Sequence, residues 1–372
     1  MSMIQQIFKK YIGKNAYDGG ITRGELESQV QVDELFKLSS NENILGPSPM
    51  ATKAMVESMH QLHEYSFRDD FPILQAISTS DSRLKTNMLF AANGGSEVIQ
   101  MICKAFLNPN DECIISTPTF IAYKNYIKNE GALVKDVPLD TSNYTIDIKA
   151  ILGAITPATR LIFVTNPNNP TGTYTNKEQI DYLVDNLPEH VIMVYDEVYY
   201  HFSEAHDFPR AIDYILEGKN VIGIHSFSKS YGLAGIRLGY GFSTPEISEY
   251  IANFKRPFVL NTLTMLAGIA ALKDEQHLTD TINLVIQGRN WLYEEFEKIG
   301  INYWKSQTNF VYIEPAMNSK ELTAALLKKG VMVRPCDAFG SKNGVRITVG
   351  DAKANAALIN ALNTILKITE HA

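Results

Sequence analysis

Residues 226–237 read Ser-Phe-Ser-Lys-Ser-Tyr-Gly-Leu-Ala-Gly-Ile-Arg, and they join two apolar runs at 221–225 and 238–242. Short apolar runs bounded by small residues and glycines predict buried strands. Lys229 therefore stands at a strand end among small residues, where partial loss of water would lower the pKa of its amine toward neutrality. A neutral amine is a nucleophile that forms Schiff bases with carbonyl compounds. A surface loop that carries one lysine and one arginine is the alternative interpretation.

The composition indicates an ordinary globular protein. The chain has 372 residues, 45% of them hydrophobic, which suffices for a large core and favours two domains. A formal net charge of -7 disfavours nucleic-acid binding, which needs clustered Lys and Arg. The three cysteines show neither metal-ligand nor disulfide spacing. No signal sequence and no membrane-length apolar run is evident, so we expect a cytoplasmic protein without a membrane partner.

The central part of the chain alternates short apolar runs with helical segments. This pattern is typical of βαβ units around a mainly parallel sheet, and hence of an α/β protein. The runs predict seven strands, at residues 88–92, 112–116, 133–137, 161–165, 191–195, 221–225 and 238–242.

Polar clusters follow several of these predicted strands. They lie at 93–97, 118–120, 166–172 and 196–199. Ligands of open α/β sheets bind at the carboxyl ends of the strands, so these clusters are candidate site residues. The helix start at Gly95 and Ser96 would present free backbone N–H groups to an anion, although a Gly-Gly turn with a serine cap is also common structure.

The last third of the chain has a different pattern of predicted elements. Helical patterns from about residue 254 are followed by predicted strands at 309–313, 331–334 and 345–350 and a helix at 320–329. We therefore expect an N-terminal arm at 1–45 that contributes to the small domain and to dimer contacts. A large ligand-binding domain at 46–258 and a small α+β domain at 259–372 would follow. The eight histidines form no metal-binding pattern, which disfavours metal catalysis.

One ligand, pyridoxal 5'-phosphate, accounts for all of the polar clusters. Lys229 would hold its aldehyde, Asp196 would contact the ring nitrogen and keep it protonated, and the ring would lie against Phe120. Asn169 and Tyr199 would reach the ring hydroxyl. The phosphate would be bound by Gly95, Ser96, Ser226, Ser228 and Arg237. Each residue also has an ordinary structural interpretation, such as a helix cap for Asp196 or core packing for Phe120.

The motifs from about residue 38 to residue 350 resemble those of a known family. They are Ser-Ser-Asn-Glu-Asn at 39–43, Asn-Pro-Asn-Asn-Pro-Thr-Gly at 166–172, Asp-Glu-Val-Tyr at 196–199, Ser-Phe-Ser-Lys at 226–229, Gly-Leu-Ala-Gly-Ile-Arg at 232–237 and Arg-Ile-Thr-Val-Gly at 346–350. In this order they resemble the class I and II aminotransferases, and within them the histidinol-phosphate aminotransferases. The resemblance implies the aspartate aminotransferase-like fold (fold type I), with a mainly parallel seven-stranded sheet between helices and a smaller α+β domain.

The resemblance also implies a substrate site. Arg346, helped by Asn309 and Asn43, would bind the carboxylate of the amino or keto acid, and Arg334 would bind the substrate phosphate or second carboxylate. Tyr17 would close over the substrate. Tyr65 would reach the cofactor phosphate of a neighbouring subunit, which implies a homodimer with shared active sites.

The reaction implied is a transamination. Histidinol phosphate and 2-oxoglutarate would give imidazole acetol phosphate and glutamate, in a ping-pong mechanism through pyridoxamine phosphate. The family usually has Tyr at Phe120, Ser-Asp at Gly95-Ser96 and Pro at Ile44, so an aromatic amino acid aminotransferase and a phosphothreonine-type decarboxylase remain alternatives. A ligand sensor without turnover and a nucleotide-binding oxidoreductase are the alternatives from other classes, and no Gly-x-Gly-x-x-Gly follows the first strand to support the latter.

Overall fold

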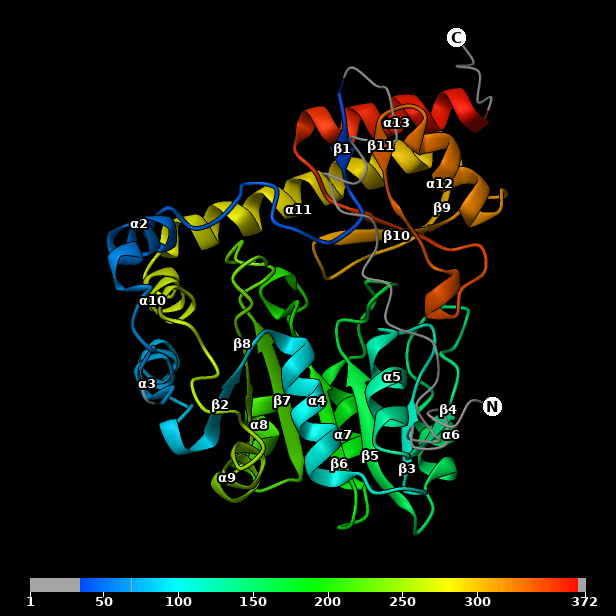
Figure 1. Cartoon of the computed structure of the whole chain (residues 1–372). Helices are drawn as coiled ribbons and strands as arrows, with labels where there is room; N and C mark the ends of the chain where they lie inside the picture. The colour runs from blue at the N-terminus through cyan, green and yellow to red at the C-terminus, as the bar shows by residue number, and fades with distance from the viewer. Residues whose placement is uncertain (1–33, 68, 367–372) are drawn as a thin grey trace, which may run out of the picture.

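The computed structural model describes residues 34–67 and 69–366 (Figure 1). Its largest element is a seven-stranded sheet in the order β2-β8-β7-β6-β5-β3-β4. The strands are β2 (Leu89–Ala92), β3 (Glu112–Ile115), β4 (Leu133–Asp136), β5 (Thr159–Thr165), β6 (Ile192–Asp196), β7 (Val221–Ser226) and β8 (Gly239–Phe242). The five strands from β4 to β7 pair in parallel, whereas β8 is antiparallel to both of its neighbours. The α/β class and the mainly parallel sheet are confirmed.

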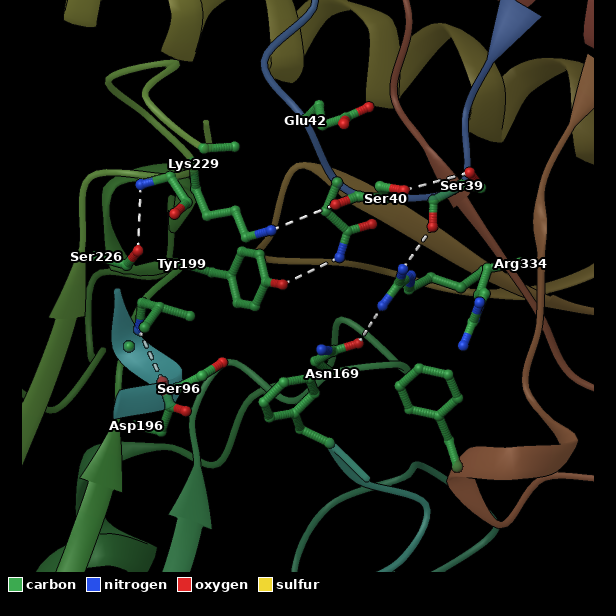
Figure 2. Close-up of a pocket in the computed structure, with 18 of the residues that line it drawn as sticks. Ser39, Ser40, Glu42, Ser96, Asn169, Asp196, Tyr199, Ser226, Lys229 and Arg334 are labelled. Atoms are coloured by element: carbon green, nitrogen blue, oxygen red, sulfur yellow. Dashed lines mark hydrogen bonds between the residues drawn. The ribbon is translucent and has the colours of Figure 1, made fainter. Parts of the chain in front are cut away.

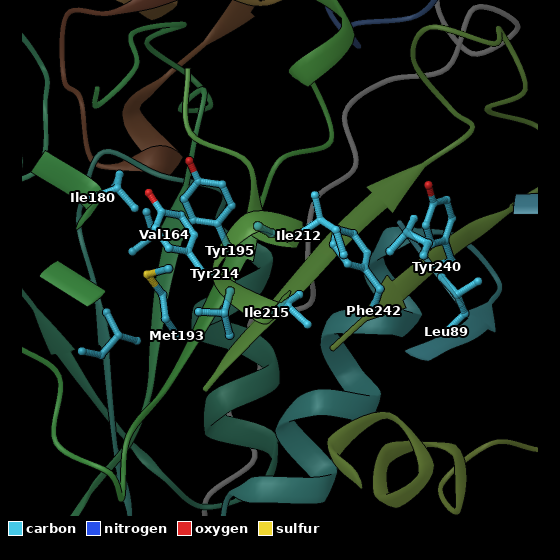
Figure 3. Packing of buried hydrophobic residues seen from close by; sticks show 14 of the residues in the cluster. Leu89, Val164, Ile180, Met193, Tyr195, Ile212, Tyr214, Ile215, Tyr240 and Phe242 are labelled. Atoms are coloured by element: carbon cyan, nitrogen blue, oxygen red, sulfur yellow. The ribbon is translucent and has the colours of Figure 1, made fainter. Parts of the chain in front are cut away.

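Both faces of this sheet are covered by helices, because successive strand residues alternate between two hydrophobic clusters. On β6, Val194 packs in one cluster, and Met193 and Tyr195 pack in the other (Figure 3). The first of these faces packs against α4 (Gly95–Phe106), α5 (Ala122–Asn129) and α9 (Pro245–Ala252). The other face packs against helices that include α6 (Ile148–Ala154), α7 (Lys177–Asp185) and α8 (Ala211–Leu216). This burial fixes the register of each strand and therefore the position of its carboxyl end.

A second, smaller sheet lies above the carboxyl ends of the first (Figure 1). It is antiparallel, in the order β12-β13-β10-β9, and its strands are β9 (Asn302–Trp304), β10 (Phe310–Glu314), β12 (Arg334–Pro335) and β13 (Val345–Thr348). A cluster of its own joins this sheet to α11 (Glu275–Lys298), α12 (Ser319–Leu327) and α13 (Ala352–Leu366). Beside it, β1 (Phe36–Lys37) pairs in parallel with β11 (Val331–Met332).

Three further helices, α2 (Pro49–Ser58), α3 (Phe71–Ser80) and α10 (Thr262–Ala271), lie together at one side of the large sheet (Figure 1). Short 3-10 turns lie at η2 (Met59–Gln61), η3 (Thr86–Met88), η4 (Tyr200–Phe202) and η5 (Asp337–Phe339). Within the described part of the chain, none of the helices has the length and apolar character needed to cross a bilayer.

The single strand predicted at 331–334 is wrong. The chain forms two short strands there, because Val331 and Met332 pair with β1 whereas Arg334 and Pro335 pair with β13. This split moves Arg334 onto the sheet that carries Arg346. The domain boundaries near residues 45 and 258 stay a prediction.

Candidate active site

A cavity of about 390 Å³ lies where the carboxyl ends of the large sheet meet β12 and β13 (Figure 2). Polar side chains from segments far apart in the sequence converge on it. Those predicted from the sequence that line it are Gly95, Ser96, Phe120, Asn169, Asp196, Tyr199, Ser226, Ser228, Lys229, Arg237, Arg334 and Arg346. The seven-stranded sheet therefore brings the predicted polar clusters to one place.

The amine of Lys229 projects into this cavity. Its Nζ donates a hydrogen bond to the carbonyl oxygen of Ser40 at 3.3 Å (Figure 2). Removal from water lowers the pKa of Lys229 to about 7, with a further lowering by Arg346. A substantial fraction of the amine is therefore neutral near pH 7, as a nucleophile or a proton acceptor requires.

Asp196 ends β6 with its carboxylate buried. Tyr123, on α5, donates a hydrogen bond to Asp196 Oδ2 at 2.5 Å, and the backbone N–H of Val198 donates to Oδ1 at 3.3 Å. Burial raises the pKa of Asp196 to about 6, while the bond from Tyr123 opposes this rise. The carboxylate is therefore ionised at neutral pH, at a site where a protonated ring nitrogen could pair with it.

An anion cradle surrounds the start of α4. Gly94 caps this helix at φ +80°, and a Cβ built there would lie 2.4 Å from a guanidinium nitrogen of Arg237. A Cβ on Gly239 would lie 2.5 Å from the backbone nitrogen of Gly95. Arg237 itself has φ +60°, a conformation that costs a side-chain-bearing residue on the order of 1–3 kcal/mol. The two glycines thus let Arg237 and β8 approach the N–H groups of the helix start, where a phosphate binds well.

Two arginines form the opposite wall. Arg334 on β12 and Arg346 on β13 are directly opposite each other in the register of the small sheet. Arg346 donates to Asn169 Oδ1 at 2.7 Å and to the carbonyl oxygen of Ser39 at 2.6 Å (Figure 2). The centre of the Phe339 ring lies 5.7 Å from the guanidinium carbon of Arg334 and 5.4 Å from that of Arg346. Phe339 therefore forms the apolar side of this wall. Adjacent guanidinium groups of this kind suit an anionic substrate group.

Asn41 links the two walls. Its side-chain amide donates to the hydroxyl of Tyr199 at 3.0 Å, and its backbone N–H donates to Thr348 Oγ1 at 2.9 Å. Asn41 has φ +55°, which asparagine tolerates better than most residues. The hydroxyl of Tyr199 is thereby held over the cavity beside Lys229, whose Nζ lies 5.8 Å from the centre of the Tyr199 ring.

Three of the predicted residues that the structure describes, Asn43, Asn309 and Tyr65, do not line the cavity. Asn43 donates to the carbonyl oxygen of Ser230 and to Thr281, and Asn309 donates to the carbonyl oxygen of Asn41. Both asparagines therefore hold in place the loops that carry cavity residues, without lining the cavity themselves. Tyr65 is 85% exposed and stacks on Phe258, and Tyr17 lies outside the described residues.

Sequence reasoning missed several residues of the site. Tyr123 follows Phe120 by three residues, and this proximity in the sequence is the local signal that the two belong to one site. Lys37, Glu42 and Ile99 also line the cavity, and the motif at 39–43 was the signal for Glu42.

The family model for class I and II aminotransferases matches residues 33–362. The chain belongs to the class I and II aminotransferases. A histidinol-phosphate aminotransferase of Moorella thermoacetica is 37% identical over 92% of this chain and 88% of that protein, and one from a Geobacillus species is 34% identical over 95% and 96%. The fold is also that of a histidinol-phosphate aminotransferase from Sinorhizobium meliloti, solved with pyridoxal-5'-phosphate, at a TM-score of 0.87 and 22% identity over 97% of this chain and 98% of that one.

This aminotransferase is pyridoxal-phosphate dependent, and the donor set of the cavity fits that cofactor. An amine with a lowered pKa, a buried carboxylate and an anion cradle at a helix start are the groups that an aldehyde, a ring nitrogen and a phosphate require. The histidinol-phosphate aminotransferase resemblance and the aspartate aminotransferase-like fold expected from the motifs are confirmed.

Proposed function

We propose that this aminotransferase transfers the amino group of histidinol phosphate to 2-oxoglutarate, giving imidazole acetol phosphate and glutamate. The observation that carries the proposal is the placement of Arg334 and Arg346 on adjacent strands, across the cavity from Lys229. A phosphate suits this pair in one half-reaction, and the distal carboxylate of 2-oxoglutarate suits it in the other. The names of the relatives from Moorella and Geobacillus support the same donor.

The cavity residues predicted from the sequence have distinct roles in this proposal. The cofactor, when bound, supplies a ring that takes up the electrons released as a bond to the substrate Cα breaks. Asp196 keeps the ring nitrogen protonated, and Tyr123 and Val198 hold its carboxylate in place. The amine of Lys229 carries the proton to and from the substrate Cα.

The remaining residues bind and orient. Gly95, Ser96, Ser226, Ser228 and Arg237 would hold the cofactor phosphate, and Phe120 would lie against the ring. Asn169 and Tyr199 would reach the ring hydroxyl, and Asn169 itself accepts a hydrogen bond from Arg346 at 2.7 Å. This bond joins the cofactor site to the substrate site, so that anion binding at Arg346 acts on a group that holds the cofactor.

A single-turnover experiment tests the donor. Purified enzyme loaded with pyridoxal phosphate should lose the absorption of the bound aldehyde form when histidinol phosphate is added, and 2-oxoglutarate should restore it. No loss with this donor would contradict the proposal.

An aromatic amino acid donor is the second candidate. Phe120, Phe339 and Ile99 line the cavity, and they would favour an apolar side chain. Loss of absorption with phenylalanine or tyrosine, but not with histidinol phosphate, would favour this candidate. Release of carbon dioxide without a keto acid would instead indicate a decarboxylase.

A homodimer is part of the proposal. Large apolar side chains are exposed from the loop before α2 to the start of α3, and Phe258 joins them by stacking on Tyr65. Exposed apolar patches mark interfaces. The exposed side chains are Ile44, Leu45, Met50, Val56, Met59, Leu62, Tyr65, Phe67, Phe71 and Phe258. A second copy would cover this face and place Tyr65 at the neighbouring cofactor phosphate. Sedimentation velocity should give twice the mass of 41.6 kDa, and a monomer of full activity would contradict the shared site.

The cytoplasm is the expected compartment. Cys103, Cys113 and Cys336 are all buried free thiols, and burial raises the pKa of each. Unpaired buried cysteines suit a reducing compartment.

A further inference from the structure

Glu42 is a carboxylate in the cavity wall for which the mechanism has no use. It lies in the loop between β1 and α2, it lines the cavity, and its side chain is 44% exposed. Lys37 donates to Glu42 Oε1 at 2.7 Å. In the view of Figure 2, Glu42 and Asp196 lie on opposite sides of the Lys229 amine, and both carboxylates line the cavity.

The charges of the cavity make Glu42 distinctive. Among the described residues that line the cavity, the carboxylates are Asp196 and Glu42, whereas the cations are Lys37, Lys229, Arg237, Arg334 and Arg346. Asp196 already accepts from Tyr123 and Val198 and faces the cofactor nitrogen. An ionised carboxylate has about four acceptor sites, so the bond from Lys37 leaves Glu42 able to accept from a substrate donor.

We propose that Glu42 binds the imidazole N–H of the amino donor and thereby selects a donor with a basic ring. This inference rests on the proposed function. Histidinol phosphate has an amine for the Lys229 side of the cavity and a phosphate for the arginine wall, which leaves its imidazole to be recognised. An imidazole donates N–H bonds and is partly cationic near neutral pH, so a carboxylate is its complement. Glutamate and 2-oxoglutarate have no such group, so Glu42 offers them no favourable contact.

The test compares the two half-reactions in Glu42→Gln holoenzyme. Glutamine keeps the shape of the side chain but removes its charge. The Michaelis constant for histidinol phosphate should rise about tenfold, because a charge-assisted bond is lost, while the constant for glutamate should change less than about twofold. Calorimetry should show the same loss in the affinity of the variant for histidinol phosphate.

Glu34→Gln is the matched control. Glu34 is half exposed and is also paired with a lysine, Lys353, but it lies away from the cavity lining. This variant should leave both half-reactions unchanged.

The outcomes separate this inference from the proposed function. If the wild-type enzyme does not react with histidinol phosphate, both are wrong. If it reacts but Glu42→Gln weakens both half-reactions equally, or neither, only the role of Glu42 is wrong. Should this variant lose its cofactor, Glu42→Asp keeps the charge on a shorter side chain. A loss with Glu42→Asp confined to histidinol phosphate would support the inference, and an equal or absent loss would overturn it.

Discussion

The two walls of the cavity hold their polar groups in different ways. On the wall formed by β6 and β7, Asp196 is buried and is fixed by Tyr123 of α5, a helix that packs on the same sheet. On the wall formed by β12 and β13, Arg334 and Arg346 come from a separate sheet, and Arg346 reaches across to Asn169 and Ser39. The first arrangement suits a permanent cofactor, and the second suits substrates that enter and leave. Variants of the first wall should therefore reduce turnover with every donor, and variants of the second should change the choice of donor.

The largest effect is expected for Lys229→Ala. Removal of the amine should lower turnover on the order of 10⁴-fold with every donor, because the proton at Cα loses its carrier. The phosphate contacts at α4 remain, so the variant should still bind the cofactor. Steady-state rates and equilibrium dialysis measure the two quantities, with the exposed Lys53→Ala as control. Persistent turnover would show that the site is elsewhere.

The second-largest loss of turnover is expected for Asp196→Asn. The amide keeps the shape of the side chain but does not keep the ring nitrogen protonated, so turnover should fall about 10²–10³-fold with all donors alike. Cofactor affinity should fall much less. Rates with histidinol phosphate and with phenylalanine check the first point, and Asp185→Asn on the surface is the control. A loss confined to one donor would contradict the expectation that this wall acts on every donor alike.

Arg334→Ala tests the second wall. Loss of a charged partner for the phosphate should reduce kcat/KM for histidinol phosphate roughly ten- to a hundredfold, and it should affect phenylalanine far less. The ratio of the two values is the readout, with the exposed Arg83→Ala as control. Equal losses would mean that Arg334 does not select the donor.

Tyr123→Phe should have the smallest effect and a defined sign. Burial raises the pKa of Asp196 to about 6, and the hydrogen bond from Tyr123 opposes that rise. Without this bond the pKa should rise further, and since activity needs the ionised carboxylate, the loss of kcat on acidification should begin at a pH higher by about 0.5–1 unit. Tyr195→Phe is the control, because Tyr195 is equally buried beside Asp196 but bonds to Asn166 and Pro209. An unchanged pH profile would show that Tyr123 does not control the pKa of Asp196 in the working enzyme.

The sequence predicted one wall better than the other, for physical reasons. In the large sheet, β6 and β7 are short apolar runs that end in a polar residue, so the pattern locates Asp196 and the segment that leads to Lys229. Contacts made by a neighbouring helix leave no such pattern, and Tyr123 is 73 residues away from Asp196. The pairing of β1 with β11 joins residues about 300 positions apart, which local propensity cannot reveal, and it caused the wrong single strand at 331–334.

One amine, that of Lys229, is expected to hold the cofactor. Borohydride reduction of the enzyme loaded with pyridoxal phosphate, followed by peptide mass spectrometry, tests it most directly. The added cofactor mass should lie on the peptide that contains Lys229, and it should be lost in Lys229→Ala. A cofactor mass on another lysine, or on none, would contradict it.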